Sequence, residues 1–259
     1  MSPGATLIYV FQVVTVVGFV LTSVRLYTSG LFRKYRIFFA FLIFSAVLTG
    51  TALTMNVRSD LYFKVWTRTE PVLWVFYVLI VLELYRLVLE NYKGLYTMGM
   101  WAMWGSVVVA ILLSSLTLWP RMGGGVYQRS RLLNYYYVIE RGVVFSLLLF
   151  LFLILLILSR FPIRLSRNVV VHCVVYTAFF LTNTLGLLLR SLFGLGMSRS
   201  VSTLLTGATA FCVLLWLIFL DKKGEESQVS AARLGVDQEE RILTTLQELN
   251  STLLRSARK

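Results

Sequence analysis

The chain has 259 residues, of which 58% are hydrophobic and 14% are charged, and its formal net charge is +13. Because a soluble domain has about 25% charged residues, this composition excludes an ordinary soluble protein. The basic residues are scattered along the chain without a cluster of interleaved aromatic residues, which argues against a nucleic-acid partner. The lipid bilayer is the expected partner, and its anionic headgroups account for the excess of basic side chains.

Seven apolar stretches predict the fold. Each has about the 17 to 25 residues that an α-helix needs to cross a hydrocarbon core of roughly 30 Å. In lipid every backbone polar group must be paired within such a segment, so these stretches are helices. We predict an all-α polytopic membrane protein, a seven-transmembrane-helix bundle over residues 1–220. The spans are Ala5–Val24, Ile37–Met55, Pro71–Leu89, Met98–Trp119, Tyr137–Leu158, Val169–Leu189 and Val201–Leu220.

Charge placement predicts the orientation of this bundle. The first 24 residues contain no Lys or Arg, whereas a cleavable signal peptide has a positive start, so we expect the first helix to be retained. The connection after it holds Arg25, Arg33, Lys34 and Arg36, and the segment after the last span contains seven Lys and Arg residues. Cytoplasmic loops carry an excess of Lys and Arg. The N-terminus is therefore expected outside and the C-terminus in the cytoplasm.

Polar residues near the outer surface form the first candidate site. Ionisable residues in a span are costly, so each is a candidate functional residue. Glu70 and Arg141 have opposite charges at similar depth, so an ion pair between the third and fifth helices is expected, either to fix helix register or to belong to a ligand site. Gln12, Trp66 and Tyr136 lie at similar depth. The candidate ligand-binding residues are Glu70, Trp74, Tyr77, Glu140, Arg141 and Asn183.

A second candidate site lies near the inner surface. Glu83, Arg86 and Glu90 are spaced by three and four residues, which places them on one helical face, and Arg86 can bridge both carboxylates. The only histidine, His172, is expected on the same side of the membrane. The cluster is either a salt bridge at the membrane edge or a switch analogous to the acidic–basic locks of seven-helix receptors.

Several kinds of chemistry have no residues to support them. The last span contains no Lys for a retinal Schiff base, and one histidine cannot make a three-histidine zinc site. We therefore expect no metal, no cofactor and no catalytic residues. Cys173 and Cys212 are expected to be apolar packing groups. Small residues around Gly207 favour a packing face on the last helix over an ion site.

The tail, residues 221–259, differs in composition from the bundle. A polar link precedes an amphipathic cytoplasmic helix that is expected over about residues 236–257. Its apolar residues follow at spacings of four, three and four: Ile242, Leu246, Leu249 and Leu253. Such a helix lies on the inner leaflet or against the bundle, or it mediates self-association or docks a protein partner.

Short motifs of aromatic and charged residues lie along the predicted bundle. They are Tyr35-Arg36-Ile37-Phe38-Phe39, Trp66, Glu70, Glu83-Leu84-Tyr85-Arg86 and Tyr92-Lys93-Gly94-Leu95, then Glu140-Arg141, Leu147–Leu158 and His172. With these motifs the chain resembles a group of uncharacterised bacterial membrane proteins common in acidobacteria. The resemblance implies seven helices and the bacterial inner (plasma) membrane, and it suggests that Glu83, Arg141 and His172 matter. It implies no chemistry.

The bundle is also broadly similar to the seven-helix sensor regions of bacterial signalling proteins, although no kinase or cyclase domain is expected after the tail. These observations lead us to expect a sensor or signal-coupling protein, not an enzyme, that binds a ligand in an outer-half pocket and relays to a partner through its C-terminal helix. A small transporter or channel and a structural subunit of a membrane complex are the alternatives.

Overall fold

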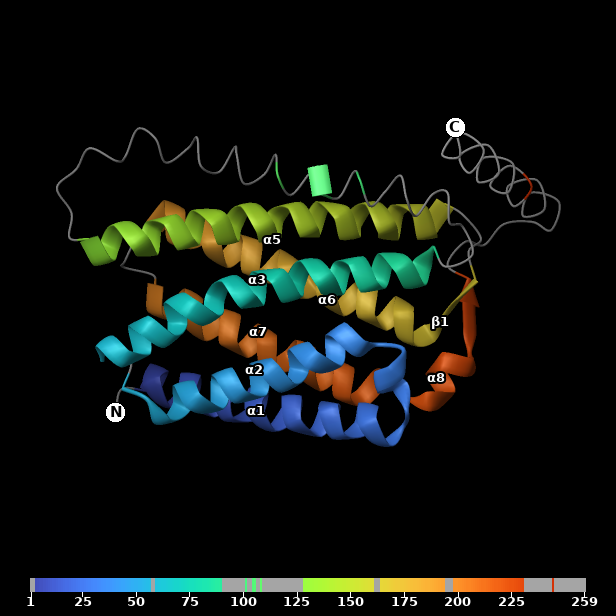
Figure 1. Ribbon diagram of the computed structural model, residues 1–259, viewed down its shortest axis with the longest axis horizontal. Coiled ribbons are helices and arrows are strands. Elements are labelled where there is room, and N and C mark those ends of the chain that lie inside the picture. The colour runs from blue at the N-terminus through green and yellow to red at the C-terminus, as the bar shows by residue number, and fades with distance from the viewer. Residues whose placement is uncertain are drawn as a thin grey trace. The chain divides into compact units, whose positions relative to one another are not determined.

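The computed structural model describes residues 3–56, 59–89, 101, 104–105, 108, 128–160, 164–193, 198–230 and 244. Helices make up most of this part of the chain (Figure 1). They are α1 (Pro3–Thr28), a short 3-10 helix η1 (Leu31–Arg33), α2 (Arg36–Thr54), α3 (Asp60–Val88), α5 (Gln128–Arg160), α6 (Arg167–Phe193), α7 (Ser198–Phe219) and α8 (Lys222–Glu226). Two short strands are also present, β1 (Arg164–Ser166) and β2 (Gln228–Ser230).

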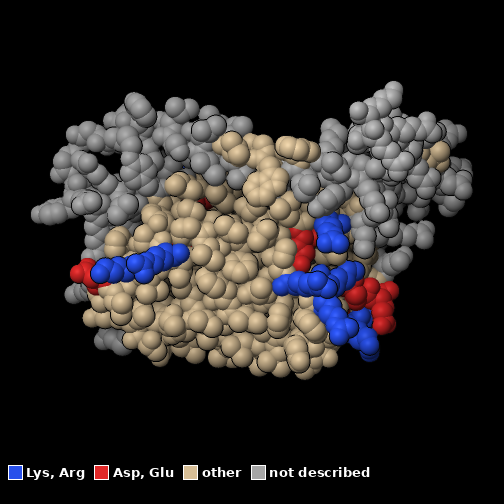
Figure 2. Space-filling view, viewed as in Figure 1, with Lys and Arg blue, Asp and Glu red and all other residues tan. Residues whose placement is uncertain are grey.

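Six of the described helices are long and apolar enough to cross a membrane, in the segments Thr6–Thr28, Arg36–Thr54, Asp60–Val88, Ile139–Leu156, Arg167–Leu189 and Ser200–Phe219. Large apolar side chains such as Val17, Phe211 and Ile218 are exposed on them, as lipid contact requires. On the face shown in Figure 2, charged side chains gather toward the ends of the helices, with uncharged side chains between. The chain is thus a multi-pass helical membrane protein.

Of the predicted fourth span, Met98–Trp119, only Trp101, Trp104, Gly105 and Val108 are among the described residues. The predicted tail helix, residues 236–257, lies outside them except for Thr244. A seventh span and an amphipathic tail helix therefore stay predictions.

The third span begins earlier than predicted. Helix α3 starts at Asp60 and runs through Pro71, the first residue of the predicted span. The Ser59 hydroxyl accepts a hydrogen bond from the Tyr62 backbone N–H at 3.1 Å, which is an N-cap interaction. The prediction was wrong at this boundary because it followed hydropathy alone and overlooked the capping serine followed by an acidic residue.

The described residues fall into two compact units, and the first comprises residues 1–80 and 174–222. In it α1 packs against α2 and α7. A Cβ atom on Gly18 would lie 2.6 Å from Val213 Cγ1, and one on Gly207 would lie 3.1 Å from Phe11 Cε2. These close approaches confirm the predicted packing face around Gly207. Arg25 Nη1 also donates a hydrogen bond to the Leu217 carbonyl, in the last turn of α7, where carbonyls lack intrahelical partners.

Aromatic side chains from three helices form the core of the first unit. The Trp216 ring on α7 lies 4.6 Å from Tyr176 on α6 and 5.0 Å from Phe38 on α2, measured between ring centroids. All three side chains are at least 98% buried. Tilted and edge-to-face ring pairs of this kind stabilise a packed core beyond the area they bury.

The second unit comprises residues 81–173 and 223–259. On α5, Val144, Leu147, Leu151 and Ile154 recur at helical spacing and are buried. The ring centroid of Phe150 lies 5.1 Å from the ring centroid of Tyr85 on α3. Strands β1 and β2 pair antiparallel, with Leu165 opposite Val229. The predicted polar link at the start of the tail, residues 222–227, instead contains α8, and strand β2 follows it.

Candidate functional site

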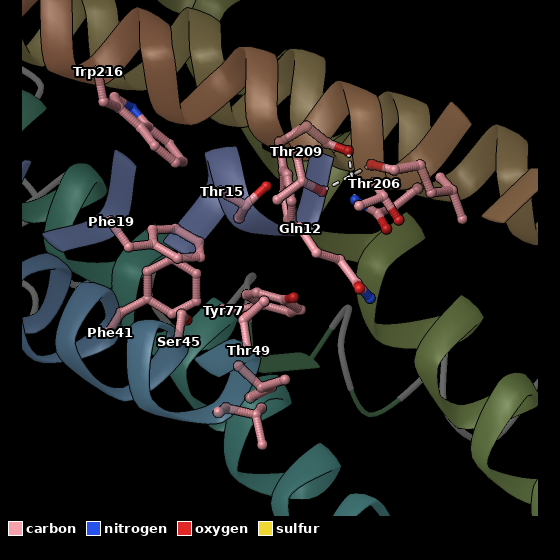
Figure 3. Close-up of a pocket in the computed structure, with 15 residues that line it drawn as sticks. Gln12, Thr15, Phe19, Phe41, Ser45, Thr49, Tyr77, Thr206, Thr209 and Trp216 are labelled. Atoms are coloured by element: carbon pink, nitrogen blue, oxygen red, sulfur yellow. Dashed lines mark hydrogen bonds between the residues drawn. The ribbon is translucent and has the colours of Figure 1, made fainter. Parts of the chain in front are cut away.

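A cavity of about 270 Å³ lies among the helices of the first unit (Figure 3). Ligand pockets for drug-sized molecules measure roughly 300–1,000 Å³, and this cavity lies just below that range, so only a small molecule fits it. Five helices contribute to it: Gln12, Thr15 and Phe19 from α1; Phe41, Ser45, Leu48 and Thr49 from α2; Leu73 and Tyr77 from α3; Phe179 and Asn183 from α6; and Leu205, Thr206, Thr209 and Trp216 from α7.

The cavity has an aromatic end and a polar end. In Figure 3, Trp216, Phe19 and Phe41 gather at one end, and Gln12 lies with Thr206 at the other. All of the lining residues are described, and none of them is Asp, Glu, Lys, Arg or His. The site is therefore amphipathic and carries no formal charge.

Three threonines in the cavity wall have already used their hydroxyl protons. Thr15 donates to the Phe11 carbonyl at 2.7 Å, Thr206 to the Ser202 carbonyl at 2.8 Å, and Thr209 to the Leu205 carbonyl at 2.9 Å. A hydroxyl has one proton and two lone pairs. Each of these oxygens can therefore only accept a hydrogen bond from a molecule in the cavity.

Asn183 and Ser45 complete the polar lining. The Asn183 side-chain amide donates to the Phe179 carbonyl at 2.9 Å, in the preceding turn of α6. Ser45 is only 5% exposed, and its Oγ makes no hydrogen bond with any described residue. A buried hydroxyl without a partner costs about 1–3 kcal/mol, so Ser45 has a proton and lone pairs available for a bound molecule.

Only some residues of the predicted outer site line the cavity. Tyr77 and Asn183 line the cavity, as does Gln12, whereas Glu70 and Trp74 do not. Glu70 and Trp74 lie one turn apart on α3, and their side chains interact with each other.

The other two predicted outer residues, Glu140 and Arg141, lie half-buried on α5 in the second unit. Because Glu70 belongs to the first unit, the expected Glu70–Arg141 ion pair stays a prediction.

The predicted inner cluster lies in the second unit. Glu83 is half-buried on α3 and Arg86 is exposed, while His172 on α6 is 1% exposed; Glu90 lies outside the described residues. His172 interacts electrostatically with Glu225 of α8, a residue that sequence reasoning did not single out.

Glu225 belongs to a set of contacts that attaches the segment after α7 to the start of α6, and we call this set the tail clasp. Its Oε2 accepts a hydrogen bond from Asn168 Nδ2 at 3.2 Å, and Asn168 is fully buried. The Arg167 backbone N–H donates to the Ser227 carbonyl at 3.0 Å, and the β1–β2 pairing continues the attachment. The clasp thus holds the beginning of the tail against one end of a membrane helix.

Replacing Glu225 by alanine is expected to loosen the tail clasp without unfolding the helices. The Asn168 amide loses a charged acceptor, and hydrogen bonds to charged groups contribute about 1.5–3 kcal/mol. Backbone amides of Arg167 and of residues 227–230 should then exchange about tenfold to a hundredfold faster in hydrogen–deuterium exchange. The neighbouring Glu226 is exposed, so Glu226→Ala is the matched control and should leave these rates unchanged. Equal rates in both variants would contradict the role of Glu225.

Sequence reasoning missed the serine and threonines of the cavity because it searched the spans for ionisable residues. A usable signal was present: Gln12 and Thr15, Ser45 and Thr49, and Thr206 and Thr209 are polar pairs spaced by three or four residues. That spacing places each pair on one face of an otherwise apolar helix.

Comparisons with known proteins match no family model, no curated protein and no solved structure. The resemblance to the acidobacterial membrane proteins stays a prediction.

Proposed function

We propose that this protein is a seven-span membrane sensor or signal-coupling protein that binds a small uncharged molecule in the cavity and relays its presence to a partner through the tail. The observation that carries this proposal is the cavity itself, an uncharged amphipathic space bordered by five apolar helices. Concave, mostly apolar spaces with a few convergent polar groups are the usual form of ligand sites.

The direction of two helices supports a seventh span. Within the second unit, the last turns of α3 and the whole of α5 run in the same direction (Figure 1). Two consecutive spans with the same direction need one membrane crossing between them. The apolar stretch Met98–Trp119 has the length and composition to supply it.

Helix α6 supports the relay. It is one continuous helix from Arg167 to Phe193; Asn183 lines the cavity, and Asn168 binds Glu225 in the tail clasp. A molecule that changes the position or stability of α6 therefore acts on the attachment of the tail. Coupling of this kind needs a ligand that binds one arrangement of the helix better than another.

Filling the cavity tests the binding step. Thr206→Trp places an indole in the space, so the variant should lose most of the small molecule that co-purifies with wild-type protein in polymer-extracted native membrane discs. Extraction and mass spectrometry measure the amount per protein. Leu204 is exposed on the same helix and does not line the cavity, so Leu204→Trp is the matched control and should retain the molecule. Equal recovery from all three proteins would contradict a ligand site.

The same samples test the relay. Hydrogen–deuterium exchange at residues 227–230 should differ between wild type and Thr206→Trp, but not between wild type and Leu204→Trp. Loss of the bound molecule with unchanged exchange in the clasp would retain binding and reject the coupling. Sealed liposomes that carry the protein and move the extracted molecule across the bilayer would instead favour a transporter.

A further inference from the structure

We infer that the molecule recognised by this cavity is an uncharged aromatic alcohol, a lipophilic phenol in the simplest case, whose hydroxyl donates to Thr15 and accepts from Ser45. This inference rests on the proposed function, since it names the ligand class of the same cavity. Three independent properties of the lining lead to it: the absence of charge, the committed hydroxyl protons of three threonines, and the aromatic end.

The absence of charge excludes ionic ligands. None of the residues that line the cavity is a carboxylate, an ammonium, a guanidinium or an imidazole. A charge taken from water into such a place costs several kcal/mol unless an opposite charge pairs with it. Phosphates, carboxylates and amines in their charged forms are therefore rejected, and a neutral molecule remains.

The direction of the hydrogen bonds selects a donor. The hydroxyl protons of Thr15, Thr206 and Thr209 are all committed to backbone carbonyls of their own helices. What these side chains offer to the cavity is lone pairs. A ligand that carries only acceptors, such as an ether or a ketone, leaves them unpaired, whereas a ligand hydroxyl satisfies one of them.

Thr15 and Ser45 are the two serine or threonine side chains of the lining that are buried. Thr15 is 4% exposed and Ser45 is 5% exposed, so a bound molecule is their natural partner. Ser45 Oγ makes no hydrogen bond with the described residues and therefore has its proton to give. In the inferred complex the ligand hydroxyl donates to Thr15 Oγ1 and accepts from Ser45 Oγ.

The aromatic end selects a ring. Phe19 and Phe41 lie with their centroids 6.2 Å apart at an interplanar angle of 81°, and Trp216 lies at the same end of the cavity (Figure 3). Rings in this arrangement favour an aromatic ligand. Its edge-to-face contacts contribute about 0.5–1.5 kcal/mol of binding free energy in addition to the burial of the ring. A phenol provides both the ring for these contacts and the hydroxyl for Thr15.

Three probes of similar size test the ligand class on the full chain in phosphatidylcholine nanodiscs. Calorimetric titration, corrected with empty nanodiscs, should give about tenfold tighter binding for 4-propylphenol than for its methyl ether, 4-propylanisole, because the ether lacks one hydrogen bond. The charged 4-propylbenzoate should not bind. Equal or tighter binding of the ether, or binding of the benzoate, would overturn the inference.

Two substitutions assign the hydrogen bonds. Thr15→Val preserves shape and should abolish the preference for the phenol over the ether. Thr22 is buried on the same helix and donates to the Gly18 carbonyl at 2.7 Å but does not line the cavity, so Thr22→Val is a matched control that should keep the preference. Ser45→Ala should weaken both probes by about tenfold, because both have an oxygen that accepts from Ser45. A preference retained in Thr15→Val would overturn the assignment.

The outcomes separate the ligand class from the proposed function. If Thr206→Trp abolishes binding of the phenol and of the ether alike, and wild type does not distinguish them, the cavity is a ligand site but the donor requirement is wrong. If neither probe binds wild-type protein and no molecule co-purifies with it, the ligand site and its class both fail.

Discussion

Replacing Gly18 with leucine is expected to separate α1 from α7 and to destabilise the protein by about 3 kcal/mol or more, because overpacking a tight interface costs about 1–3 kcal/mol for smaller insertions. Even a single Cβ atom at this position would lie 2.6 Å from Val213 Cγ1. Val213 is fully buried, and a valine in a helix has essentially one side-chain rotamer, so it cannot turn away. Unfolding of the detergent-solubilised protein by added SDS, followed by circular dichroism, measures the loss.

Gly50 provides the matched control. It lies in α2, where a Cβ atom would meet nothing within 4 Å. Gly50→Leu makes the same chemical change in an apolar helix and should leave the unfolding midpoint unchanged or raise it, since leucine has a higher helix propensity than glycine. Similar destabilisation by both substitutions would show that the effect comes from the helix and not from the approach of α1 to α7.

The membrane helices were the most predictable part of the fold because the length and hydropathy of one continuous segment are enough to predict a span. Apolar runs of sufficient length predicted the helices that the structure describes from α1 to α7. Their ends were less predictable. Helix α3 extends from its apolar part to Asp60 because Ser59 caps it, and a hydropathy reading gives little weight to a cap.

The cavity was only partly accessible from sequence. Tyr77 and Asn183 are predicted candidates because each is a polar residue within an apolar span, and both line the cavity. Ser45 and Thr15 did not stand out, since serine and threonine are common in membrane helices and usually bond to their own backbone. What distinguishes them is that the Thr15 hydroxyl proton is already donated to a backbone carbonyl whereas the Ser45 hydroxyl proton is not. Only the three-dimensional structure shows this difference.

The tail clasp was beyond sequence reasoning. Asn168 and Glu225 are 57 residues apart, and the β1–β2 pairing joins two segments of only three residues each. No periodicity links such segments. Short strands with few apolar side chains gain their stability from the helices that bring them together. Their pairing therefore depends on the fold and cannot be predicted from the two short segments alone.

A seventh membrane crossing is expected to place Lys34 and Lys222 on the same side of the membrane. The chain between them crosses six times if residues 98–119 span the bilayer, and five times if they do not. Lys34→Cys and Lys222→Cys change exposed residues at helix ends, and the two native cysteines are buried. In right-side-out vesicles a membrane-impermeant maleimide should label neither variant, and after inversion it should label both, because the positive-inside rule places both residues in the cytoplasm.

Asn56→Cys is the outer reference for this experiment. Asn56 is exposed between α2 and α3, one crossing away from Lys34, and should be labelled only in right-side-out vesicles. The wild-type chain, with only Cys173 and Cys212, gives the background. Labelling of Lys222→Cys together with Asn56→Cys, and not with Lys34→Cys, would exclude a crossing by residues 98–119. It would also place the tail clasp outside the cell, where a cytoplasmic partner could not reach it, so this one measurement decides both the number of spans and the direction of the proposed relay.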